Sequence, residues 1–277
     1  MSHSPHPRQP PRSVESSGAS PRVPPDPAPR RPLWVWPLVA LSATSVAIVA
    51  FSFLLPVALG LGPGQMPWYR EFFDVNHEAN FTAWWNTGLL LAAGLGFLAV
   101  MMLRRRSLGE RGWASAAWLL PGVLLTAMSL DELSSIHERF DDVYAALFGE
   151  NPLASFQWLA LGVPVALVVI GLFVLSARTL PSTTSRLMVV GILIFFLGAI
   201  VVESIPAIFD IWRRTWAYMV TYHVEELLEF LGAGLLAVAP WAAWRREHDE
   251  GRVILTALPA RWRGRERRPG STARPLA

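Results

Sequence analysis

The chain has 277 residues, of which 52% are hydrophobic and 16% are charged. This composition departs from that of a soluble domain and is typical of a polytopic membrane protein. Cysteine is absent, which excludes disulfides, thiolate metal sites and cysteine nucleophiles. The formal net charge is +3 and all 24 basic residues are Arg, a usage that we attribute to a GC-rich bacterial genome.

The chain begins with a segment, residues 1–32, that is rich in Pro, Ser and Arg and holds almost nothing apolar to bury. Burial cannot offset the entropy of ordering such a segment, so we expect it to be disordered. The first apolar run, residues 33–60, is too long and starts too late for a cleaved signal peptide. We therefore interpret it as an uncleaved membrane anchor.

Five further apolar runs follow the anchor, each long enough to cross a bilayer, which takes about 20 helical residues. Between the first two runs lies LGPGQMPWYREFFDVNHEAN, which predicts an interfacial loop with a short amphipathic piece. The sequence thus predicts an all-α, six-span transmembrane helical bundle, residues 33–244, followed by an Arg-rich, mobile C-terminal tail, residues 245–277. The expected spans are 33–60, 83–103, 113–136, 154–177, 187–209 and 217–244.

The positions of the Arg residues predict the orientation of the bundle. If both termini are cytoplasmic, 20 of the 24 Arg residues fall in cytoplasmic tails and loops, as the positive-inside rule requires. Only Arg70, Arg139, Arg213 and Arg214 then lie outside. We predict a multi-pass protein of a bacterial plasma membrane, surrounded by membrane lipids and without a nucleic-acid partner.

Ionisable residues collect near the expected outer ends of several spans. One span ends with SLDELSSIHE, residues 129–138, and the last begins with TYHVEELLEFLGAG, residues 221–234. At about 1.5 Å per residue, Glu226 and Glu229 lie roughly 14 to 18 Å below the outer surface. A carboxylate at this depth costs at least about 2 kcal/mol unless it faces protein, water or a counter-ion. We therefore expect a common internal chamber.

Helical periodicity predicts which side chains face that chamber. At about 100° per residue, Asp131 and Glu138 share a face, as do Glu226 and Glu229, whereas Glu132 points about 100° away and is expected in another contact. In the expected span 187–209, Glu203 lies on the same face as Asp210, which follows the end of that span.

Two local features accompany these residues. Pro206, three residues after Glu203, is expected to free the carbonyl of Val202 and to kink its helix. Gly232 and Gly234 are expected to permit close helix packing beneath the acidic layer.

The donor set indicates a divalent metal site. Carboxylates and His without Cys suit Zn, Fe or Mn. His223 and Glu226 are spaced i, i+3, the reverse order of the Glu-x-x-His element of di-metal bundles, and a single-metal site with a bound water is equally open. The expected ligands are His137, Glu203, His223, Glu226 and Glu229, with Asp131 and Glu138 as catalytic base or supporting groups.

A purely structural explanation competes with this interpretation. Acidic residues near a helix N-terminus are stabilised by the macrodipole, and Arg139, Arg213 and Arg214 could pair with Asp210 and Glu138. We favour that explanation for any single residue and function for the set, because charges from three helices rarely gather at lipid depth by chance. The roles of His77 and Glu78 stay open.

The expected function is metal-dependent hydrolysis or oxidation of a lipid or lipid-linked substrate. A proton- or cation-coupled transporter would need polar residues on both sides of the midplane, and the inner halves offer almost none. That transporter and a non-catalytic membrane scaffold remain the alternatives. The oligomeric state is not predicted.

Three blocks of the sequence resemble an uncharacterised group of bacterial polytopic membrane proteins: EANFTAWWN, SLDELSSIHE and VEELLEFLGAGLL. That resemblance implies no reaction. The chain is also loosely similar to the alkaline ceramidase and adiponectin receptor superfamily of seven-span zinc hydrolases. This similarity implies zinc-binding or catalytic roles for His77, His137, His223, Asp131 and Ser134, although the chain has six expected spans, no His-x-x-x-His pair and many more Glu residues.

Overall fold

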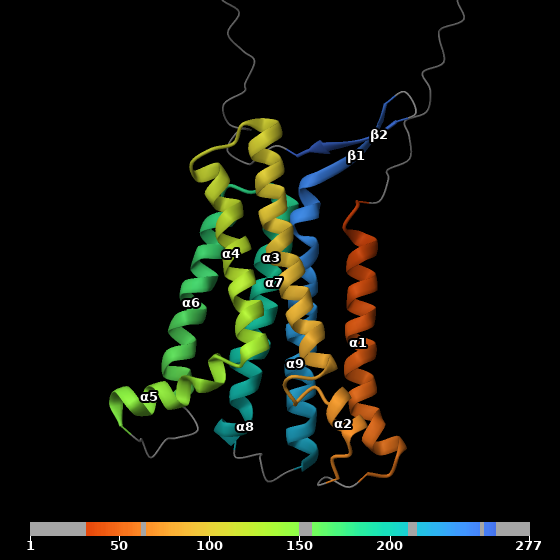
Figure 1. Ribbon diagram of the computed structural model, residues 1–277, viewed down its shortest axis with the longest axis vertical. Helices are drawn as coiled ribbons and strands as arrows, with labels where there is room; N and C mark the ends of the chain where they lie inside the picture. The colour runs from red at the N-terminus through yellow and green to blue at the C-terminus, as the bar shows by residue number, and fades with distance from the viewer. Residues whose placement is uncertain (1–31, 62–64, 150–156, 210–214, 250–251, 259–277) are drawn as a thin grey trace, which may run out of the picture. The chain divides into compact units, whose positions relative to one another are not determined.

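The computed structural model confirms an all-α, six-span bundle. It describes residues 32–61, 65–149, 157–209, 215–249 and 252–258. In this part of the chain, six helical segments are long and apolar enough to cross a membrane (Figure 1). They are Val35–Ala58, Phe81–Leu108, Trp113–Ser134, Leu159–Ala177, Ser182–Pro206 and Trp216–Ala243. The expected disorder of residues 1–31 and 259–277 falls outside the described residues.

The spans are built from helices joined by short elements. The long helices are α1 (Val35–Ala58), α3 (Phe81–Leu108), α4 (Trp113–Ser134), α6 (Gln157–Ala177), α7 (Ser182–Phe196) and α9 (Thr215–Val238). The short elements are α2 (Trp68–Phe73), η1 (His137–Arg139), α5 (Phe140–Phe148), the π-helical turn η3 (Leu197–Val202), α8 (Glu203–Phe209), η5 (Pro240–Ala243), β1 (Trp244–Asp249) and β2 (Arg252–Ala257).

Helix α9 is the central element, because it contacts α1, α3, α7, η3 and α8. Its approach to α7 is close: a Cβ atom placed on Gly232 would lie 2.6 Å from the backbone nitrogen of Phe195 and 2.7 Å from the carbonyl oxygen of Gly191. Close packing at Gly232 is therefore as the sequence predicts. Gly234 plays no such part, since its nearest neighbour would be the Leu41 Cβ at 3.9 Å.

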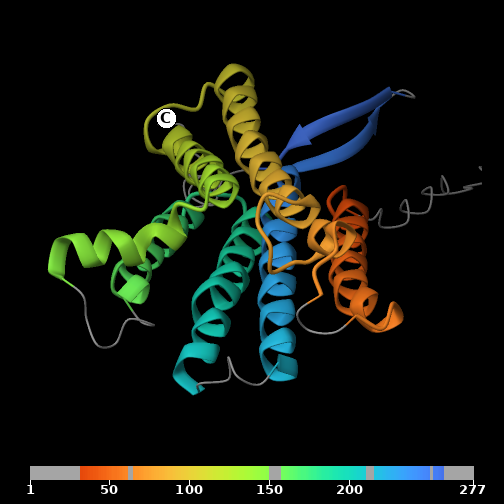
Figure 2. The ribbon, with the colours of Figure 1, turned by 60° about the horizontal axis from the view of Figure 1, so that its bottom comes forward.

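An apolar core fills the half of the bundle nearer the β1–β2 hairpin, which we call the hairpin end. Phe97, Trp118, Phe173 and Leu236 are almost fully buried there. Within a bilayer these side chains stabilise the bundle through close van der Waals packing, because lipid tails are as apolar as the core. The opposite half, where α2 and α5 lie, is called the loop end (Figures 1 and 2).

The hairpin is an element that the sequence analysis missed. Strands β1 and β2 pair antiparallel, with Trp244 opposite Ala257, in a region that was expected to be a mobile tail. The Arg104 guanidinium joins the hairpin to the bundle: it forms a bidentate ion pair with Glu110, at 2.8 and 3.0 Å, and donates to the Leu258 carbonyl. This ion pair is buried, and bidentate geometry makes it a strong one.

The end of α4 and the segment before Pro206 have local structures that the sequence analysis did not predict. Helix α4 stops at Ser134 instead of residue 136, because Ser135 adopts a left-handed conformation with φ of 50°. The chain then turns into η1 and α5. Before Pro206 the helix widens into the π-helical turn η3. Pro has no backbone N–H and cannot form the regular helical hydrogen bond, and the wider turn accommodates this loss.

Candidate functional site

A cavity of about 530 Å³ lies among α4, α6, η3, α8, α9 and the loop that precedes α3. Its charged lining is almost wholly acidic. Within the described residues, no Arg or Lys lines it. The ionisable lining residues are His77, Glu78, Asp131, Glu132, His137, Glu203, Glu225, Glu226 and Glu229, together with Tyr218 and Tyr222.

A buried amide joins two of the carboxylates that line the cavity. The Asn86 amide nitrogen donates to Glu132 at 3.1 Å and to Glu229 at 3.2 Å. Asn86 is fully buried, and its Oδ1 atom has no hydrogen-bond partner among the described residues. Helices α3, α4 and α9 are thus tied together at the acidic layer. The expectation that Glu132 turns away from the other carboxylates was wrong.

Asp131 and His137 form an ion pair at the rim of the cavity. The Asp131 carboxylate accepts the His137 backbone N–H at 3.0 Å, and the ring Nδ1 lies 3.1 Å from its other oxygen. Burial lowers the pKa of His137, but the hydrogen bond and the charges of Asp131, Glu132 and Glu203 outweigh burial and raise it to about 9. The turn at Ser135 brings the two residues together.

The other end of the cavity is apolar. Its side chains come from α4, α6, α7 and η3. The cavity is therefore amphipathic, with a charged end and an apolar end. The apolar lining consists of Leu124, Ala127, Met128, Val165, Ala166, Val169, Phe195, Phe196, Ala199 and Ile200.

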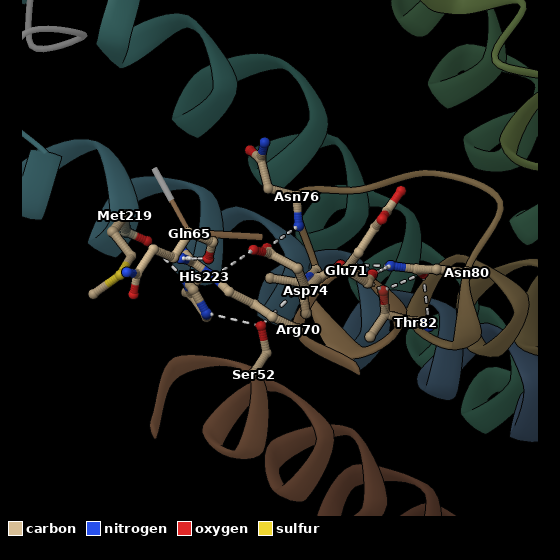
Figure 3. A network of polar contacts seen from close by, with 11 residues as sticks. Ser52, Gln65, Arg70, Glu71, Asp74, Asn76, Asn80, Thr82, Met219 and His223 are labelled. Carbon is tan, nitrogen blue, oxygen red and sulfur yellow. Dashed lines mark hydrogen bonds and ion pairs between the residues drawn. The ribbon is translucent and has the colours of Figure 1, made fainter. Parts of the chain in front are cut away.

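The loop between α1 and α3 forms one wall of the cavity, and a polar network holds it in place (Figure 3). Val75, Asn76, His77 and Glu78 line the cavity. The Val75 N–H donates to Ser52 of α1, and the Tyr218 hydroxyl of α9 donates to Asn76.

Asn80 anchors the end of this loop. Its amide nitrogen donates to the carbonyls of Glu71 and Asp74, and its Oδ1 accepts the backbone N–H groups of Thr82 and Ala83. Asn80 is thus the N-cap of α3, an arrangement typical of Asn at this position.

His223, one of the expected ligands, is not among the residues that line the cavity. Its Nδ1 lies 2.7 Å from the Met219 carbonyl, so Nδ1 carries the proton and donates it. Its Nε2 lies 3.1 Å from the Ser52 hydroxyl, which donates to it and accepts from Val75. With both ring nitrogens engaged, His223 is a packing residue that joins α1 to α9 (Figure 3).

The remaining expected site residues divide into two groups. His137, Glu203, Glu226 and Glu229 line the cavity, as does Asp131. Nothing is described for the Glu138 side chain, and Asp210, Arg213 and Arg214 lie outside the described residues. In the described part of the chain, no three His, Asp or Glu side chains stand close enough to hold a metal ion as they are.

Three lining or supporting residues were missing from the expected site. Glu132 was assigned to another contact, and neither Glu225 nor Asn86 was among the expected site residues. The signal for Asn86 was present, because an amide in the middle of an apolar span needs a buried partner.

The chain belongs to the family described as a domain of unknown function (DUF8692), which matches residues 38–244. The match covers nearly all of the six-span bundle, in line with the resemblance to an uncharacterised family. No curated protein and no solved structure matches the chain. These comparisons do not support the analogy to the ceramidase and adiponectin receptor superfamily.

Proposed function

We propose that this member of the DUF8692 family binds a cation in its acidic cavity and uses it in hydrolytic or oxidative chemistry on a membrane-borne amphiphile. The observation that carries the proposal is the gathering of carboxylates from α4, α8 and α9 around one cavity. Like charges at membrane depth repel one another and are poorly solvated. A divalent cation offsets two of them and so stabilises the arrangement.

The ligands that we propose are Glu132, Glu226 and Glu229, with Glu203 and His137 within the same lining. Carboxylate and imidazole donors without thiolate fit Zn²⁺, Fe²⁺ or Mn²⁺. Because these side chains do not converge as they stand, binding requires Glu side chains to rotate toward the ion. Asp131, paired with His137 at the rim, is placed to act as a base.

The amphipathic lining supports an amphiphilic substrate. A polar head group would meet the bound cation, and an apolar tail would occupy the end lined by Met128, Val169 and Phe195. If the loop end faces out of the cell, as the Arg distribution predicts, the substrate would come from the outer leaflet of a plasma membrane. A carrier is less well supported, because the apolar core fills the hairpin end.

Metal binding by the detergent-purified protein tests the proposal. We expect elemental analysis and titration calorimetry to detect Mn²⁺ or Zn²⁺ bound to the wild type. Glu226→Gln and Glu229→Gln remove a charge with little change of shape and should weaken binding about tenfold or more. Affinity should also rise with pH, because ligand carboxylates must lose their protons.

Glu71→Gln is the matched control, since this exposed carboxylate lies in α2 outside the cavity. The proposal fails if the wild type binds no divalent cation or if all three variants bind as it does. Proton-dependent cation uptake into vesicles would instead assign the cavity to a carrier.

A further inference from the structure

Helix α5 has an apolar face that no described part of the chain fully covers. It begins at Phe140, directly after His137 and its η1 turn, and it packs against α6 at the loop end. Both views show α5 running across the direction of the spans (Figures 1 and 2). Leu147 is 66% exposed and Phe148 is 68% exposed.

The apolar residues of α5 lie on one side of the helix. At about 100° per residue, Phe140, Val143, Tyr144, Leu147 and Phe148 fall within an arc of about 140°. The exposed Asp142 lies on the opposite side. A helix with one apolar and one acidic face that lies across the spans has the properties of an interfacial helix.

The helices that precede and follow α5 in the chain also expose large apolar side chains. At the end of α4, Leu130 and Leu133 are exposed by 56% and 62%, and on α6 Leu167 is exposed by 63%. An apolar surface of this extent on transmembrane helices is covered by acyl chains. The occupant of the α5 face that fits these exposed apolar surfaces is the bilayer interface itself.

The same face also reaches the cavity. Phe140 lines the cavity, whereas Leu147 and Phe148 lie two turns further along, about 12 Å away by helical rise. We propose that α5 lies in the membrane interface and that its apolar face forms the path by which a bilayer-resident amphiphile reaches the acidic cavity. The path rests on the proposed function, whereas the interfacial position of α5 does not.

Site-directed spin labelling tests the position of α5. The natural chain has no Cys, so Leu147→Cys and Asp142→Cys each give one labelling site. In phosphatidylcholine vesicles, the label at 147 should be relaxed mainly by oxygen, which partitions into lipid. The label at 142 should be relaxed mainly by a water-soluble nickel complex. Leu167→Cys provides the lipid reference and Glu71→Cys the aqueous one.

Equal access of the nickel complex to positions 142 and 147 would overturn the interfacial position. Phe148→Cys repeats the measurement at a second site, so that one misfolded variant does not decide the result. Circular dichroism and thermal unfolding identify any such variant.

The path is tested in the absence of Mn²⁺, with a long-chain alkyltrimethylammonium probe whose cationic head group takes the place of the metal ion among the carboxylates. The probe is added to vesicles that already contain the protein. Leu147→Gln should slow its binding severalfold and leave Mn²⁺ affinity unchanged. Unchanged probe kinetics would refute the path while leaving metal binding, and hence the proposed function, intact. If the wild type did not bind Mn²⁺, the proposed function would be refuted instead. The spin labels at positions 142 and 147 would still determine where α5 lies.

Discussion

The Asn86 side-chain amide binds two carboxylates at once. Its nitrogen donates to Glu132 and Glu229, which places both carboxylates at the wall of the cavity. A buried polar group without partners costs about 1–3 kcal/mol, so a sequence that keeps Asn in an apolar span indicates such partners. Periodicity alone could not identify them, because the angle of Glu132 on its own helix does not reveal the position of a neighbouring helix.

His223 and Ser52 stabilise the attachment of α1. Ser52→Ala should leave the His223 ring and the Val75 N–H without their partner, at a cost of about 1–3 kcal/mol. Thermal unfolding in detergent should show a lower Tm for Ser52→Ala and for His223→Ala. The double variant should lose less than the two single variants together, because both belong to one network.

Cation affinity separates this packing role from a ligand role. His223→Ala should bind Mn²⁺ within about twofold of the wild type, provided that it folds. A loss comparable with that of Glu226→Gln would show that His223 is a ligand after all.

The rim ion pair predicts a pH dependence of stability. The pKa of His137 is about 9 in the folded chain, above the 6.5 of the free side chain. Folding therefore takes up a proton at pH values between these two pKa values. The contribution is fully present below about pH 6.5 and is lost as pH rises through about 9. Because both side chains are partly exposed, screening limits it to about 1 kcal/mol.

The measurement is Tm against pH for the wild type and for His137→Gln. The wild type should be the more stable protein at pH 6, and the difference should vanish by about pH 10. A difference that stays constant over this range would contradict the assigned ion pair.

Gly232 is one of the small residues that permit the close packing of α7 and α9. Gly232→Ala places a Cβ against the backbone of Phe195 and Gly191, which side-chain rotation cannot relieve, and overpacking of this kind costs about 1–3 kcal/mol. Gly234→Ala would make only an ordinary van der Waals contact, with the Leu41 Cβ at 3.9 Å, and should be neutral or stabilising by up to about 1 kcal/mol. Chemical or thermal unfolding of the two variants compares them directly, and equal effects would argue against close packing at Gly232.

Helices were easier to predict than their ends. Long apolar runs predict the spans because a bilayer demands internal hydrogen bonding over a fixed length. The end of α4 depends on the left-handed Ser135, a conformation that the residue type does not favour. The hairpin depends on Arg104 reaching the Leu258 carbonyl, a contact between residues far apart in sequence. Neither leaves a periodic signal.

The arrangement of the whole bundle separates two kinds of interior. The hairpin end contains the apolar core, and the loop end contains the acidic cavity. The sequence analysis predicted the gathering of carboxylates near one end of the spans, because it is a consequence of helix direction. It could not predict which face of α9 turns toward the cavity, so it grouped His223 with Glu226.

The membrane orientation of the bundle is the next prediction. We expect the loop end to face outward, since most Arg residues then lie inside. Single-cysteine variants at exposed positions on either side, Glu71→Cys and Ser107→Cys, test it with an impermeant maleimide. Position 71 should be labelled in intact cells and position 107 only after permeabilisation. The reverse pattern would invert the topology.

Locating a bound cation directly is the sharpest measurement of the central claim. Crystals grown with Mn²⁺ and measured at the manganese absorption edge should show an anomalous peak inside the cavity, about 2.0 to 2.6 Å from carboxylate oxygens of residues such as Glu226 and Glu229. A cavity without a peak, with Mn²⁺ bound elsewhere or nowhere, would contradict the cation site.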